Sequence, residues 1–183
     1  MEETMKTWKV ALLAAALAII VAGPILAQNA VKGVTTDVHA EKGDFNVLGG
    51  IGYGWRGFGV SGGVEYIFQK FDIPGFPLTM GIMGLAGLDF GSGFDVSAAG
   101  MATLHWGLKA YKDFPEFLRK FDWYMGLGLG VGMIPFGFGM SSGGGVSYYV
   151  NEKLAIDLHS FYVNHFVGGA SGVGGTIGIR YKL

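Results

Sequence analysis

Apolar and polar residues alternate along most of the chain from residue 43 onward. The last segment, 176–183, shows the pattern simply, because Ile, Ile, Tyr and Leu occupy every second position with Thr, Gly, Arg and Lys between them. A two-residue period is typical of a β-strand with one apolar face. The pattern recurs upstream, and the sequence predicts eight strands, at 43–55, 58–69, 78–90, 94–106, 123–134, 138–150, 154–163 and 176–183.

The sequence contains too few helical segments to cover eight apolar strand faces. Lipid covers such faces in membrane barrels. An unpaired strand edge in hydrocarbon would leave backbone N–H and C=O groups without partners, so 176–183 is expected to pair with 43–55. The sequence therefore predicts an all-β fold, an eight-stranded antiparallel transmembrane β-barrel. A soluble barrel whose apolar faces are buried in an oligomer is the alternative. The residues expected to face lipid at mid-depth are Val64, Leu104, Leu129 and Ile179.

Two connections stand out from the short turns. In 107–122, Asp113 and Glu116 flank a proline in the manner of a helix start, and aromatic residues follow at helical spacing. This pattern predicts one short amphipathic helix near 113–121, either at the membrane interface or as a segment tucked over the barrel mouth with its aromatic residues buried. The glycine-rich stretch 164–173 is expected to be a loop.

Composition supports a membrane class and excludes others. Glycine makes up 34 of the 183 residues, more than twice the average usage of about 7%, without the Gly-X-Y period of collagen. The formal net charge is −1, so nucleic acid is not an expected partner. There is no cysteine, so disulfides and thiol chemistry are absent.

The N-terminus resembles a secretory signal peptide. Lys6 and Lys9 precede an apolar run at 10–22, and Ala27 is a small residue at the expected cleavage point. Residues 1–27 are therefore expected to be a cleaved signal peptide, with an uncleaved anchor helix as the alternative. Residues 28–42 are polar and lack periodicity, so they are expected to form a flexible or loosely docked leader before a barrel domain at 43–183. An added strand at 34–38 is the alternative.

The C-terminal 36 residues carry a family resemblance. Two tyrosines, a polar turn and the sequence Leu-Ala-Ile-Asp-Leu at 154–158 precede the closing strand with its apolar and aromatic alternation. This arrangement resembles the small bacterial outer-membrane barrels of the outer membrane protein A and opacity-protein groups. The resemblance implies residence in the outer membrane, contact with its lipid, periplasmic termini, and recognition of the C-terminal strand by the barrel-assembly machinery.

Polar residues on the glycine-containing strand faces are expected to point into the barrel. Glu65 lies in the middle of an apolar strand and needs water or a partner, and Arg180 on the closing strand is the expected one. Asp157 is expected near Arg180 or Lys182. The predicted lumen cluster contains Glu65, Asp95, His105, Asp157, His159, Arg180 and Lys182, with Gln69, Asp89 and Thr103 also inward.

No residue pattern in the sequence points to catalysis. His105 and His159 lie on strands that are not neighbours, so a metal site is not expected. His159 and Ser160 are adjacent and therefore point to opposite faces, unlike the residues of a hydrolase. The sequence favours a structural or surface role with no enzymatic activity and no cofactor. The alternative is a narrow channel or binder for small apolar molecules, because inward glycines would leave lumen volume unfilled.

Overall fold

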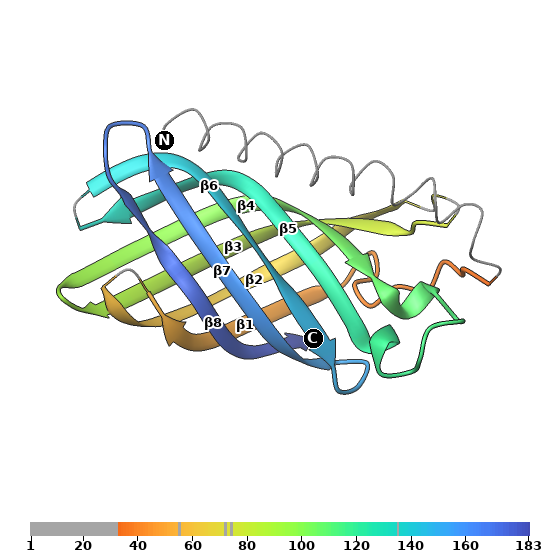
Figure 1. The fold of residues 1–183 in the computed structure, drawn as a ribbon. Coiled ribbons are helices and arrows are strands. Elements are labelled where there is room, and N and C mark those ends of the chain that lie inside the picture. The colour runs from red at the N-terminus through yellow and green to blue at the C-terminus, as the bar shows by residue number, and fades with distance from the viewer. Residues whose placement is uncertain (1–32, 55, 72, 74, 135) are drawn as a thin grey trace, which may run out of the picture.

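Eight antiparallel strands form a closed barrel in which each strand pairs with the next and the last pairs with the first (Figure 1). The structure, a computed structural model, describes residues 33–183 except 55, 72, 74 and 135. The predicted signal peptide lies outside the described residues. The predicted all-β barrel is confirmed. The strands are β1 Phe45–Tyr53, β2 Gly57–Phe71, β3 Leu78–Gly91, β4 Phe94–Gly107, β5 Phe121–Met133, β6 Phe136–Tyr149, β7 Leu154–His165 and β8 Ala170–Lys182.

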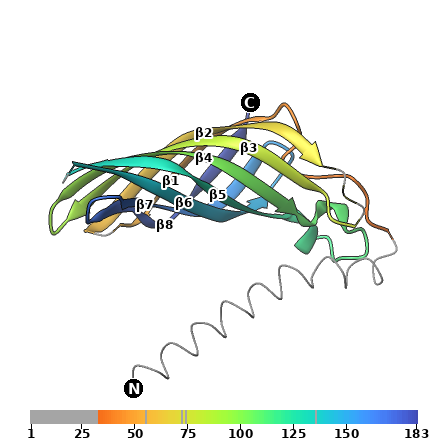
Figure 2. The ribbon, with the colours of Figure 1, turned by 90° about the horizontal axis from the view of Figure 1, so that it is seen from above.

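The seam between β1 and β8 closes the sheet in the expected register. Val47 lies opposite Tyr181, and Ile51 lies opposite Ile177. An odd number of steps around the ring makes the first and last strands antiparallel, so both termini of the barrel lie at one end. The leader and the β4–β5 connection lie at that same end in both views (Figures 1 and 2).

The closing strand is longer than the sequence predicted. β7 continues to His165 and β8 begins at Ala170, so the expected loop at 164–173 shrinks to residues 166–169. Val173 is fully buried inside the barrel. The sequence prediction assumed that apolar residues face outward, and an inward valine breaks this rule. The residues before 176 therefore did not match the expected strand pattern.

A β-bulge in β2 changes which residues point inward. The pairing with β3 shifts between Ile67 and Gln69, so Gln69 lies opposite Met80 and Lys70 lies opposite Thr79. One extra residue in a strand moves every later side chain to the other face. The prediction that Gln69 points inward is therefore wrong, and Lys70 takes that face.

The β4–β5 connection contains no α-helix among the described residues. It has two 3₁₀ turns, η1 Leu108–Ala110 and η2 Leu118–Lys120, in place of the amphipathic helix expected near 113–121. Tyr111 holds the segment, because its hydroxyl accepts a hydrogen bond from the Trp106 indole at 3.0 Å. Phe117 is 59% exposed, so the aromatic residues are not all tucked over the mouth. No helix among the described residues is long and apolar enough to cross a membrane.

Residues 33–44, termed here the leader segment, pack across the end of the barrel. Val38 and Ala40 are buried, and the His39 ring stacks on Tyr149 with 4.2 Å between centroids. Lys182 donates to the His39 carbonyl at 2.9 Å. The described part of the leader is therefore docked, because its small and apolar residues gain burial there. The alternative of an added strand at 34–38 reduces to a single bridge between Val34 and Tyr111.

Candidate functional site

The outer surface is an apolar band between two aromatic rims. At mid-height Leu127 is 67% exposed and Met125 is 62% exposed. Trp106 packs against Trp123 near the end that carries the termini, and Phe90 packs against Phe94 at the opposite end. An apolar band flanked by aromatic girdles is the surface that spans a bilayer. The chain forms a transmembrane β-barrel. The predicted lipid-facing residues are all on this surface: Val64, Leu104, Leu129 and Ile179.

The middle of the lumen is closed by buried apolar side chains, termed here the apolar belt. They are Leu48, Met83, Leu85, Ala99, Met101, Tyr124, Phe161, Val163 and Val173. Inward glycines provide the space for them, since a Cβ on Gly87 would lie 2.5 Å from Val173 and 3.0 Å from Phe161. A Cβ on Gly130 would likewise lie 2.6 Å from Val163. The expectation that inward glycines leave the lumen unfilled is wrong at these positions.

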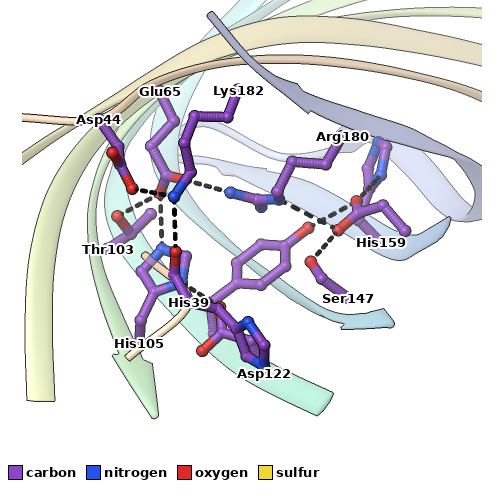
Figure 3. Close-up of polar contacts among 12 residues, drawn as sticks. His39, Asp44, Glu65, Thr103, His105, Asp122, Ser147, His159, Arg180 and Lys182 are labelled. Atoms are coloured by element: carbon purple, nitrogen blue, oxygen red, sulfur yellow. Dashed lines mark hydrogen bonds and ion pairs between the residues drawn. The ribbon is translucent and has the colours of Figure 1, made fainter. Parts of the chain in front are cut away.

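Glu65 is the centre of a buried polar network between the apolar belt and the leader segment. Its carboxylate accepts hydrogen bonds from Thr103 at 2.6 Å and His105 at 2.9 Å. The Arg180 guanidinium donates to its second oxygen. Both Glu65 and Arg180 are fully buried, so the ion pair is formed away from water (Figure 3).

Asp157 contacts the side of the Arg180 guanidinium that faces away from Glu65. The Nε of Arg180 lies 3.4 Å from Asp157 Oδ1, and Ser147 donates to the same oxygen at 2.5 Å. Tyr124 donates to Oδ2 at 2.9 Å, while the guanidinium carbon lies 4.4 Å from the centre of the Tyr124 ring. Arg180 therefore links two carboxylates from different strands, β2 and β7, and is held flat by an aromatic face.

His105 is charged in this arrangement. Its Nδ1 lies 2.8 Å from Asp122 Oδ2, and its Nε2 lies 2.9 Å from Glu65 Oε1. An ionised carboxylate accepts hydrogen bonds only, so both ring nitrogens must donate. The side chain is therefore an imidazolium that bridges the two acids.

His159 joins Asp157 to two buried hydroxyl groups. Its Nδ1 lies 2.8 Å from Asp157 Oδ2. The Thr176 hydroxyl donates to the His159 carbonyl at 3.1 Å and lies 3.2 Å from the Ser61 hydroxyl. Ser61 in turn lies 2.7 Å from His159 Nε2, so these contacts link β2, β7 and β8 inside the barrel.

Six ionisable side chains form this network, termed here the six-residue network. They are Arg180, His105, His159, Glu65, Asp122 and Asp157. Buried charges persist when they are paired and hydrogen-bonded. Each of the six contacts at least one ionisable partner within the network.

Asp157, His159 and Ser61 follow the connectivity of a hydrolase triad, which the sequence did not predict. The two partners His159 and Ser61 are 98 residues apart in the chain. In a triad the histidine removes the serine proton, which requires a free Nε2 lone pair. Here Ser61 and His159 are both buried, and the trio joins β2 to β7 inside the barrel.

The remaining predicted site residues lie outside this network. Lys182 sits at the end of the barrel, 2.6 Å from Asp44 Oδ2. Asp95 lies at the opposite end, directly across from Asp89, and both are buried on the inner face. The described residues contain no group of three or more His, Cys, Asp or Glu side chains arranged to hold a metal ion.

Sequence reasoning missed four members of the polar network. Asp122 was assigned to the connection before β5, although β5 begins at Phe121. Tyr124 lies between the outward residues Trp123 and Met125, so the two-residue period of the strand predicts that it points inward. The other two are hydroxyl residues, whose partners no local pattern reveals: Ser61 and Ser147.

No family model and no curated protein matches the chain. The chain is similar to a solved structure described as "De novo design of transmembrane beta-barrels", with a TM-score of 0.46 and 18% identity over 78% of this chain and 98% of that one. It is also similar to Ail, the attachment invasion locus protein of Yersinia pestis, with a TM-score of 0.46 and 12% identity over 78% of this chain and all (100%) of that one. Neither similarity assigns an activity to this barrel.

Proposed function

We propose that the protein is a sealed structural barrel of a bacterial outer membrane, exported by a signal peptide and without catalytic activity. The observation that supports this proposal is the filled lumen. The apolar belt closes the middle of the barrel, and the six-residue network and the leader segment close one end. An eight-stranded barrel has an interior just wide enough to be filled by side chains.

The alternative of a glycine-lined channel has less support. Phe161 and Val163 occupy the space beside inward glycines and are fully buried. A route for small apolar molecules through the lumen would require these side chains to leave their positions. The outer surface then remains the part of the molecule available to lipid and to partners.

Conductance across planar bilayers tests the sealed lumen. The purified full-length barrel is expected to give no steps above the lipid baseline. The double variant Phe161→Gly and Met101→Gly, which shortens two side chains of the apolar belt, serves as the comparison for an opened lumen. Steady ion conductance by the unmodified barrel would contradict the proposal.

The cellular location and the assembly partner need a separate test. Fractionation of a Gram-negative host, followed by heat-modifiable gel migration, is expected to find the mature chain as a compact barrel in the outer membrane. Removal of residues 179–183 is expected to prevent insertion, because the barrel-assembly machinery would lose its strand signal. Recovery of the unmodified chain in the soluble fraction would rule out the proposed location.

A further inference from the structure

The β4–β5 connection folds onto an outward-facing tryptophan of the barrel wall. Trp106 lies opposite Trp123 on the outer surface and is 37% exposed. The Tyr111 hydroxyl accepts a hydrogen bond from the Trp106 indole at 3.0 Å and donates to the Gly75 carbonyl at 3.1 Å. Because Trp106 belongs to the lipid-facing surface, the segment packed on it borders the lipid as well.

The aromatic rim of the barrel continues into this connection. The Phe114 ring stacks on Tyr111 with 5.3 Å between centroids and is 38% exposed. Phe117 follows one turn later and is 59% exposed. Aromatic side chains next to an apolar band are typical anchors at the level of the lipid headgroups. The two phenylalanines therefore extend the lipid contact of Trp106 beyond the end of its strand.

Basic side chains outnumber acidic ones in the same connection. The basic residues are Lys109, Lys112, Arg119 and Lys120, and the acidic residues are Asp113 and Glu116. Among the described residues, the only ion pair of these four cations is the contact between Lys120 and Glu116, which is long at 3.9 Å. Asp113 is turned toward the leader segment, with its Oδ1 3.5 Å from the position of a Cβ on Gly33. The connection therefore presents net positive charge beside its exposed phenylalanines.

We propose that the β4–β5 connection binds anionic phospholipid headgroups in the leaflet at the end that carries the termini. Phe114 and Phe117 enter the headgroup region, and Lys112, Arg119 and Lys120 contact the lipid phosphates. Long basic side chains lay their apolar stems along the surface and keep their charge at the headgroups, where phosphate oxygens accept hydrogen bonds from them.

Charge also decides between lipid and a second copy of the barrel. A two-fold dimer contact would place the same surface against itself, so the net positive charge of the connection would face an identical charge. An anionic leaflet instead attracts each nearby basic side chain, which favours binding by about fivefold per residue. Anionic lipid is therefore the occupant that matches both the aromatic and the basic side chains.

Site-directed fluorescence in lipid vesicles tests where the connection lies. The chain contains no cysteine, so one introduced cysteine carries one nitrobenzoxadiazole label. The full-length barrel with a label at Phe117→Cys is expected to be shielded from aqueous iodide and quenched by lipid that is spin-labelled near its headgroup. A label at Glu152→Cys, in the exposed β6–β7 turn at the same end, should remain accessible to iodide. A label at Leu127→Cys, which is 67% exposed at mid-height, reports insertion through its quenching by lipid.

A pair of double variants tests the recognition of charge in the same labelled barrel. In vesicles with equal parts of phosphatidylglycerol and phosphatidylcholine, spin-labelled phosphatidylglycerol is expected to quench the label at Phe117→Cys about fivefold more effectively. Lys112→Gln with Lys120→Gln should remove this preference. The matched control, Lys42→Gln with Lys153→Gln, removes two exposed basic residues from the same end and should keep it. High salt should weaken the preference of the unmodified barrel, because exposed charges are screened.

Four results would overturn the proposal. Equal iodide quenching at Phe117→Cys and Glu152→Cys would place the connection in water. Shielding from iodide without quenching by lipid would show that protein covers Phe117, as in a dimer. Equal quenching by the two lipids, or an equal preference in both double variants, would show that the basic residues do not select anionic headgroups. Absence of lipid quenching at Leu127→Cys would contradict the transmembrane barrel itself and this proposal with it.

Discussion

Arg180 on β8 reaches past β1 to the carboxylate of Glu65 on β2, so this ion pair spans the seam at which the barrel closes. The intervening residues Leu48 and Asn46 lie on β1, paired with β8 on one side and with β2 on the other. The same guanidinium also contacts Asp157 on β7. One cation therefore ties together three strands around the closure.

Replacing Arg180 should destabilise the barrel strongly. Arg180→Met leaves the Glu65 and Asp157 carboxylates buried without their cation, and losing one partner of a buried pair costs about 3–5 kcal/mol. Urea unfolding in detergent, followed by gel migration, measures the change. Adding Glu65→Gln to Arg180→Met should recover part of the loss. Lys120→Met is the control, because its pair with Glu116 is long, at 3.9 Å, and exposed; a similar loss in this control would contradict the prediction.

The folding free-energy cost of a charged residue on the lipid-facing surface should increase with its depth in the bilayer. Leu129 is 49% exposed in the middle of β5, and Met133 is 53% exposed at its end. Leu129→Arg is expected to cost about 2–4 kcal/mol and Met133→Arg about 0–1 kcal/mol. Reversible folding into lipid vesicles provides the two free energies. Equal costs at both positions would show that β5 crosses the bilayer at another depth.

Inward and outward glycines should respond differently to an added methyl group. Gly87→Ala brings a Cβ to 2.5 Å from Val173, whereas Gly84→Ala meets no atom within 4 Å. Overpacking of this kind costs about 1–3 kcal/mol, so only Gly87→Ala should lower stability. The added substitution Val173→Ala should reduce the loss by freeing space. Equal stability of Gly84→Ala and Gly87→Ala would show that the apolar belt is not tightly packed.

Docking of the leader segment should weaken in acid. Burial, the largest cause, lowers the pKa of His39 from 6.5; the Lys109 and Lys182 charges also lower this pKa, whereas Asp122 and the Arg119 carbonyl raise it. The docked leader then binds fewer protons than a free one, so its docking is fully stable above about pH 6.5 and is lost as the pH falls from there toward the lowered pKa.

Hydrogen exchange of the leader segment measures this effect. Backbone amides near His39 should lose protection between pH 7 and pH 5, at exchange rates corrected for pH, while amides of β5 keep theirs. His39→Phe retains an aromatic ring to stack on Tyr149 and removes the titration, so its leader should stay protected. A pH response that is equal in His39→Phe would assign the titration to another group.

Most of the fold could be predicted from the two-residue alternation of apolar and polar positions. Every predicted strand exists, because lipid outside the barrel requires an apolar residue at each outward position, and this produces a simple alternation in the sequence. The errors in two of the strands share one cause. The bulge at Ile67/Gln69 and the inward Val173 both break the assumed link between polarity and side-chain direction.

The site could be predicted from the sequence only in part. The predicted strand order placed Glu65 near Arg180, because a single strand separates theirs. The 98-residue contact between Ser61 and His159 and the docking of the leader segment depend on barrel diameter, stagger and packing. No local pattern in a sequence encodes those quantities. The residues next to a serine in the chain also do not indicate which distant group its hydroxyl will contact.

The position of Arg180 after both of its carboxylate partners in the chain has a consequence for biogenesis. During synthesis Glu65 and Asp157 emerge first, and their compensating cation follows 115 residues after Glu65 and 23 residues after Asp157. A chain released before that point would have to desolvate two unneutralised carboxylates in order to enter the bilayer. The desolvation cost of these two carboxylates therefore favours the aqueous phase for an incomplete barrel, and chaperones and proteases have access to it there.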